Sequence, residues 1–136
     1  MKILRKTVFA IIMTMPVFLT GCPLLVSFTI RIDNNGENIA VTVVRLVNLE
    51  SRDNVTDNLL PVEVSPGSTR RVLVMMDDAG DADAVKVRVE SVNPQQPLSF
   101  STTREVDGGL AAGKTIVVTV EGSPTQSVSV DVEAIE

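Results

Sequence analysis

The chain has 136 residues, enough for one ordinary domain with a single sizeable core, so we expect no second domain. The formal net charge is −5, and it becomes −8 beyond residue 21, because Lys2, Arg5 and Lys6 precede that point and all 17 acidic residues follow it; such a surface disfavours nucleic-acid binding. The chain contains no His, Trp or Tyr, so the commonest general base is absent and we expect no enzyme and no cofactor.

The N-terminal segment is typical of a signal peptide. A basic start at Lys2, Arg5 and Lys6 leads into an apolar stretch over residues 7–19. As a helix this stretch would span about 20 Å, against the roughly 30 Å of a bilayer's hydrocarbon core, so a permanent transmembrane helix fits poorly. We therefore expect residues 1–21 to be removed during export.

The segment ends in Leu19, Thr20, Gly21 and Cys22, which resembles the lipobox of bacterial lipoproteins. The resemblance implies cleavage between Gly21 and Cys22 and attachment of diacylglycerol to the Cys22 thiol, with acylation of the new amino terminus. Several acyl chains anchor a protein stably, whereas one binds only marginally. Cys22 is the only cysteine, so it forms no intramolecular disulfide. The alternatives are a secretory signal with a chance cysteine, or an apolar N-terminus buried in a cytosolic protein.

Pro23 follows the expected lipidated cysteine. In enteric lipoproteins an Asp at that position favours retention in the inner membrane, so the resemblance implies the periplasmic face of the outer membrane. Strand alternation begins at Val26, which leaves residues 22–25 as a tether of at most roughly 10 Å. We expect the folded domain, residues 26–136, to be held close to the lipid.

Apolar residues beyond Cys22 recur with a period of two, which predicts strands and no convincing helix. The turn residues Asn34, Asn35 and Gly36 separate the first two strands and predict a hairpin. The expected strands cover residues 26–32, 39–43, 59–64, 69–76, 85–89, 98–106, 115–120 and 127–132. About eight strands of this kind predict an all-β fold, a single two-sheet β-sandwich of immunoglobulin-like or related Greek-key type.

An acidic loop contains Asp77, Asp78, Asp81 and Asp83, which makes it the best candidate for binding Ca²⁺. Its spacing does not match an EF-hand loop, because the twelfth position from Asp77 is Arg88 and not Glu. We therefore interpret it as a solvated turn and assign no catalytic and no metal-binding residue.

These features favour a non-enzymatic envelope lipoprotein that acts as a protein-interaction or structural module. Its partners would be the bilayer, through acylated Cys22, and another envelope protein, because a sandwich has open strand edges to which a partner can add. We expect Pro97 and the charged residues Arg70, Lys86 and Arg88 to protect such edges. The first alternative is a domain that binds a small ligand or Ca²⁺. Residues 43–46 and 66–69 are similar to the small sandwich lipoprotein of type VI secretion, which implies a second alternative, a subunit of a secretion apparatus.

Overall fold

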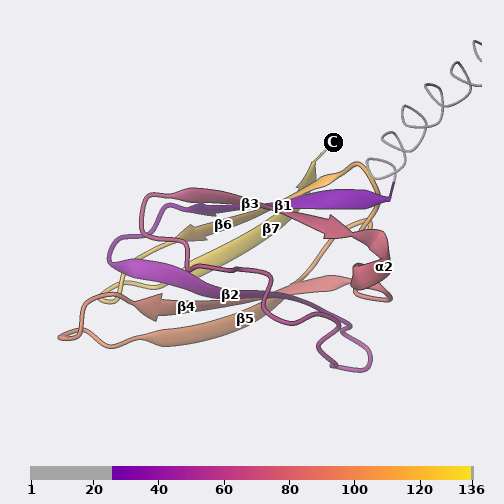
Figure 1. Cartoon of the computed structure of the whole chain (residues 1–136). Coiled ribbons are helices and arrows are strands. Elements are labelled where there is room, and N and C mark those ends of the chain that lie inside the picture. The colour runs from indigo at the N-terminus through magenta and orange to yellow at the C-terminus, as the bar shows by residue number, and fades with distance from the viewer. Residues whose placement is uncertain (1–25, 136) are drawn as a thin grey trace, which may run out of the picture.

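The computed structural model describes residues 26–135, and it confirms the all-β sandwich of two sheets (Figure 1). One sheet has the strand order β3-β1-β6-β7, and the other has the order β2-β4-β5. The elements are β1 Ser27–Asn34, β2 Ile39–Val47, β3 Thr69–Met75, α2 Met76–Ala79, β4 Ala84–Ser91, β5 Ser99–Glu105, β6 Thr115–Glu121 and β7 Ser129–Ile135.

Seven strands are present in the described part of the chain, one fewer than predicted, because residues 59–64 form no regular strand. This segment runs beside β2 and bonds to it at two separate points, a bridge between Val64 and Val41 and a bond from the Leu59 N–H to the Val44 carbonyl at 2.8 Å. Pro61 interrupts the segment, and proline has no N–H to donate to a ladder of backbone hydrogen bonds. Its apolar residues are enough to predict a strand, but its backbone does not continue the pairing.

The hairpin predicted between the first two strands is wrong. β1 lies between β3, which is antiparallel to it, and β6, which is parallel, whereas β2 pairs with β4 in the other sheet. The connection crosses between the sheets around the fully buried Asn34. Its Nδ2 donates to the carbonyls of Ile39 at 2.8 Å and Val64 at 3.0 Å, and its Oδ1 accepts the N–H of Gly36 at 3.0 Å. Residues typical of a hairpin turn therefore build a corner between two layers.

The core lies between the two sheets and is filled by alternate residues of the strands. Phe28 and Ile30, two residues apart on β1, are both buried. The fully buried positions of three central strands are Phe28, Ile30 and Ile32 of β1, Val85, Val87 and Val89 of β4, and Ile116, Val118 and Val120 of β6. Period-two alternation is thus confirmed where a strand has neighbours on both sides.

β2 departs from strict alternation at a bulge around Thr42. The antiparallel register with β4 shifts between Val41 and Val43, which leaves one extra residue on β2. An extra residue reverses the faces of the strand beyond it, so Val44 is buried whereas Val43 is partly exposed. The two-residue repeat expected over residues 39–43 is therefore broken at Thr42.

The strand order differs from that of a constant-type immunoglobulin domain. A constant-type immunoglobulin domain also has sheets of four and three strands, but its first two strands pair with each other. Here the first two strands belong to different sheets. The molecule thus has the layered architecture that the sequence predicts, with an order of strands that the sequence does not predict.

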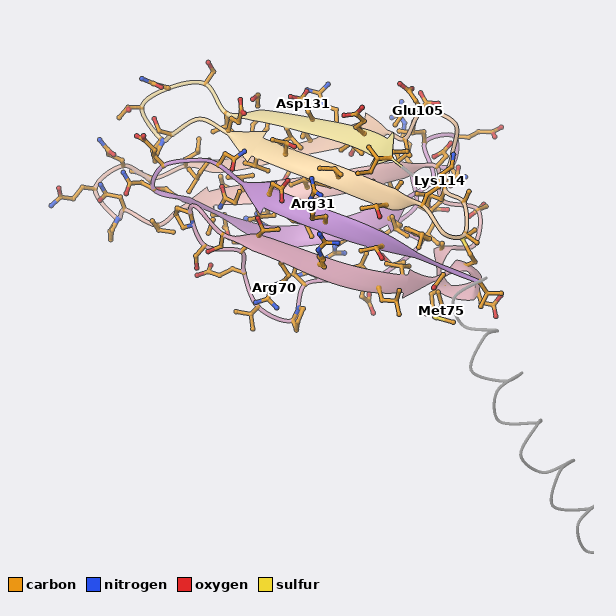
Figure 2. The ribbon with its side chains drawn as sticks, turned by 90° about the horizontal axis from the view of Figure 1, so that it is seen from above. Arg31, Arg70, Met75, Glu105, Lys114 and Asp131 are labelled. Atoms are coloured by element: carbon orange, nitrogen blue, oxygen red, sulfur yellow. The ribbon has the colours of Figure 1, made fainter. Side chains whose placement is uncertain are left out.

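The strands run between two ends of the sandwich (Figure 1). We name the end at which β1 begins the entry end, with loops 48–58, 76–83 and 106–114, and the opposite one the far end, with loops 35–38, 61–68, 92–98 and 122–128. Figure 2 shows Met75 and Lys114 at the entry end and Arg31 in the middle of the four-stranded sheet. Among residues 26–135, no helix has the length and apolar character needed to cross a membrane.

Candidate binding groove

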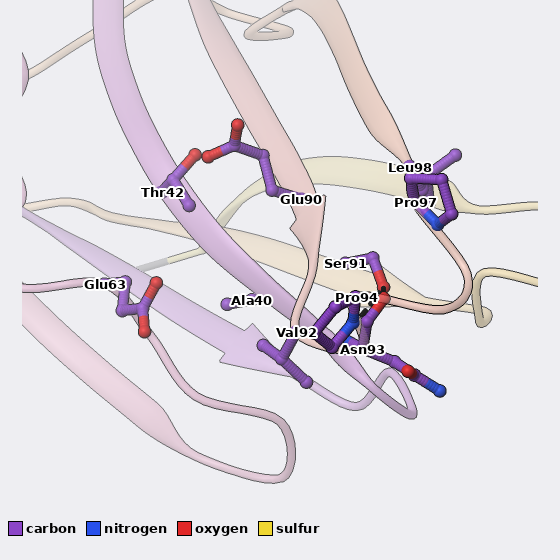
Figure 3. A pocket seen from close by; sticks show the side chains of 10 residues that line it. All are labelled: Ala40, Thr42, Glu63, Glu90, Ser91, Val92, Asn93, Pro94, Pro97 and Leu98. Carbon is purple, nitrogen blue, oxygen red and sulfur yellow. Dashed lines mark hydrogen bonds between the residues drawn. The ribbon is translucent and has the colours of Figure 1, made fainter.

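A groove of about 490 Å³ opens at the far end of the sandwich (Figure 3). Its floor is the beginning of β2, with Ala40 and Thr42, and its walls come from the segment before β3 and from the loop that joins β4 to β5. Figure 3 shows Glu63 on one side of Ala40, and Pro97 and Leu98 on the other side. Three separate stretches of the chain therefore form it.

The wall formed by residues 91–98 is stabilised by its own hydrogen bonds. Ser91 Oγ donates to the carbonyl of Asn93 at 3.1 Å and accepts the Asn93 N–H at 3.0 Å. The Ser91 N–H donates to the carbonyl of Leu98 at 3.0 Å, which closes the base of the loop. Proline at positions 94 and 97 restricts the backbone further. This wall is therefore formed before any partner binds, which reduces the entropy lost on binding.

The groove combines apolar and acidic groups. The Val92 side chain is 47% exposed, and Leu98 packs only partly against the core, so both can contact a partner. Glu90 forms an ion pair with Arg88 at 3.2 Å, whereas Glu63 is exposed and has no ion pair or side-chain hydrogen bond in residues 26–135. The groove can therefore accept an apolar side chain next to a positive charge.

The hydroxyl groups of the groove are held by the backbone. Thr42 Oγ1 donates to the carbonyl of Arg88 at 3.4 Å, and Ser91 Oγ bonds to Asn93 as described above. A nucleophilic hydroxyl needs a base within hydrogen-bonding distance. Here both hydroxyls bond to backbone groups, those of Arg88 and Asn93.

The sequence-predicted site residues fall in two places. Gly21 and Cys22, with the rest of the lipobox, lie outside the described residues. In the acidic loop, Asp77 and Asp78 are exposed on α2, a helical turn where a plain loop was expected. The Asp83 carboxylate is bonded to the backbone, because its Oδ1 accepts the Leu49 N–H at 2.9 Å. No group of three or more metal-ligating side chains is found in residues 26–135.

Sequence reasoning missed the groove. Glu63 and Glu90 come from segments that are 27 residues apart, and nothing in their local pattern indicates that they share a surface. The prolines of the 92–98 loop were the one available signal, because paired prolines mark a rigid connection. From the sequence, however, these prolines indicate only that a strand ends there, and not that the loop forms one wall of a groove.

Comparison with known proteins yields no family. No family model matches the chain, and no curated protein sequence matches it. Among solved structures, it is similar to one described as a Gram negative toxin, with 13% identity, a TM-score of 0.45, and coverage of 79% of this chain and 23% of that one. It is also similar to the cytotoxin suilysin from Streptococcus suis, with 12% identity, a TM-score of 0.41, and coverage of 82% and 23%. The chain thus spans less than a quarter of either protein, and we draw nothing about function from them.

Proposed function

We propose that this chain is a lipid-anchored envelope lipoprotein, non-enzymatic, whose sandwich binds another envelope protein through the far-end groove. The observation that carries the proposal is the position of the groove. It lies at the end of the sandwich opposite the start of β1, and β1 begins only five residues after Cys22. Acyl chains on Cys22 would hold the entry end toward the bilayer and leave the groove facing the periplasm.

The chemistry of the groove defines the partner. Val92, Pro94 and Leu98 offer apolar contact, and Glu63 offers a carboxylate with no cation beside it in residues 26–135. A protein segment with an exposed apolar side chain flanked by Lys or Arg would satisfy both. Opposite charges at the rim of an interface mainly speed association and select the partner.

The first prediction concerns the proposed lipid anchor at Cys22. Replacing Cys22 by Ala should abolish incorporation of labelled fatty acid and leave an uncut precursor, because the thiol that accepts the lipid is gone. Mass spectrometry of the protein purified from a Gram-negative host would measure both effects. Pro23→Ala is the matched control and should be acylated and cut normally. Acylation that persists in Cys22→Ala would contradict the proposal.

The second prediction concerns binding of a partner protein at the far-end groove. A photoreactive amino acid at position 92 should crosslink to a protein in intact cells, whereas the same group at exposed position 101 on β5 should not. Reversing the charge in Glu63→Lys should reduce the yield at position 92 by about fivefold, because the rim attraction becomes repulsion. Equal yields at positions 92 and 101, or a yield insensitive to Glu63→Lys, would refute binding at the groove.

A further inference from the structure

A second pocket, of about 410 Å³, lies on the three-stranded sheet near the entry end. Lys86 of β4 and Thr103 of β5 belong to its lining and are direct neighbours across the two strands. Val47, Leu49 and Arg52 contribute from the end of β2 and the loop beyond it. The pocket is therefore basic, on a domain whose net charge is strongly negative.

Lys86, which lines the pocket, lies beside a second cation of the same sheet. Arg45 on β2 is the direct cross-strand partner of Lys86, and both side chains are half-buried. Like charges at directly opposite positions destabilise a sheet. The sequence predicts that Lys86 protects a strand edge. This prediction is wrong, because β4 is the central strand of its sheet.

The cations Arg45, Arg52 and Lys86 have no anionic partner among residues 26–135. The two ion pairs of residues 26–135 are Arg31 with Asp33, and Arg88 with Glu90, each at 3.2 Å. The side chains of Arg45, Arg52 and Lys86 take part in no ion pair or hydrogen bond there.

The other sheet shows how a similar pair is normally compensated. Arg31 and Arg71 are also direct cross-strand partners, but the Asp33 carboxylate lies 3.2 Å from the Arg31 guanidinium. Such a carboxylate offsets the repulsion between the two arginines. The Arg45 and Lys86 pair has no carboxylate in ion-pairing contact within residues 26–135, so an anion from outside would offset the repulsion between the two cations.

The loop that carries Arg52 is built to hold this residue in place. Arg52 has a φ of 63°, in the left-handed region that disfavours side chains with a Cβ. Its N–H donates to the carbonyl of Asn48 at 2.8 Å, and Asn48 Nδ2 donates to the carbonyl of Asp81 at 2.7 Å. Residues held in such conformations by surrounding bonds concentrate at functional sites.

We propose that this pocket binds a phosphate group, presented by a soluble phosphomonoester or by a lipid headgroup. Arginine guanidinium groups match the oxygens of phosphate in a planar, bidentate manner, and lysine adds a point charge. Two cations in the lining, Arg52 and Lys86, with Arg45 beside Lys86, favour a ligand with more than one negative charge or several anionic oxygens, and therefore phosphate over a single carboxylate. The Thr103 hydroxyl, which is exposed, can donate one further hydrogen bond. This site rests on described residues alone and is independent of the proposed function.

The test uses the full chain, labelled with ¹⁵N in detergent micelles, titrated with inorganic phosphate at constant ionic strength. Amide signals of Arg52, Lys86 and Thr103 should shift and saturate. Lys86→Gln should weaken binding by about tenfold, the lower limit for losing a hydrogen bond to a charged group. Arg52→Gly should weaken it similarly and melt at no lower temperature, because glycine accepts the left-handed backbone. This variant separates a lost ligand from a lost fold.

Arg71→Gln is the matched control, since it removes an exposed arginine from the other sheet. It should bind phosphate as well as the unaltered chain does. Equal weakening in Arg71→Gln would show unspecific attraction between charges and overturn the site. Tighter binding of acetate than of phosphate, or no saturable shift, would overturn it as well.

Two further arms distinguish the sources of phosphate. The chain is placed in nanodiscs of two kinds, phosphatidylcholine alone and phosphatidylcholine with phosphatidylglycerol. Glycerol phosphate is then added to the nanodiscs that contain phosphatidylcholine alone. Shifts at Lys86 on adding phosphatidylglycerol identify a lipid headgroup, and shifts only with glycerol phosphate identify a soluble ligand. A response in neither arm would contradict the proposal.

Discussion

Replacing Gly122 by Ala is expected to lower the free energy of unfolding by about 4 kcal/mol, since steric strain of this kind reaches the largest single-residue effects. Gly122 follows β6 with a φ of 114°, where glycine is strongly favoured. A Cβ there would lie 2.3 Å from the Ser127 carbonyl oxygen and 2.8 Å from the Cα of Val128. Both are backbone atoms, so the connection between β6 and β7 would have to move. Urea unfolding followed by circular dichroism measures the change.

Gly113→Ala is the control for this prediction. Gly113 also has a positive φ, 81°, but an added Cβ would meet no atom within 4 Å. Only the backbone strain remains, so the expected loss is about 1 kcal/mol. Similar losses in Gly113→Ala and Gly122→Ala would show that the close approach of Ser127 is not what requires glycine at position 122.

Replacing Asn34 by Ala should lower the free energy of unfolding by about 3 kcal/mol, because each buried polar group left without a partner costs about 1 to 3 kcal/mol. The Asn34 side chain bonds to the carbonyls of Ile39 and Val64 and to the N–H of Gly36, all within 3.0 Å. Alanine removes the bonds to the buried Ile39 carbonyl and Gly36 N–H, whereas the Val64 carbonyl still accepts the Val41 N–H at 3.0 Å. Chemical unfolding at equilibrium would measure the loss, with an unchanged m-value if the fold is retained.

Asn35→Ala is the matched comparison, since Asn35 is the exposed neighbour and contributes a backbone hydrogen bond to the carbonyl of Val120 that the substitution keeps. The expected loss is within about 0.5 kcal/mol, as for most surface substitutions. If Asn34→Ala costs no more than Asn35→Ala does, the corner between the sheets is not held by this side chain.

Neither of the two candidate surfaces can be recognised from the sequence. The groove residues Glu63 and Glu90, and the pocket residues Arg52 and Lys86, lie far apart along the chain. Charged residues on strands are ordinarily interpreted as exposed groups or as protection of a strand edge, which is what the sequence leads us to expect of Lys86 and Arg88. Only the register that places Lys86 opposite Arg45 shows an uncompensated pair of cations.

By itself, the sequence determined where the seven strands lie and which residues the central strands β1, β4 and β6 bury, because the two-residue repeat of a strand is a local property. The lipid anchor at Cys22 also comes from the sequence and stays a proposal. The tertiary structure decided the pairing of β1 with β3 and β6, the corner at Asn34 and the bulge at Thr42. Pairing joins residues that are distant in the chain, and its energy comes from burial and hydrogen bonds that exist only once the two sheets have met. For the same reason, the groove and the basic pocket became visible only in the folded domain.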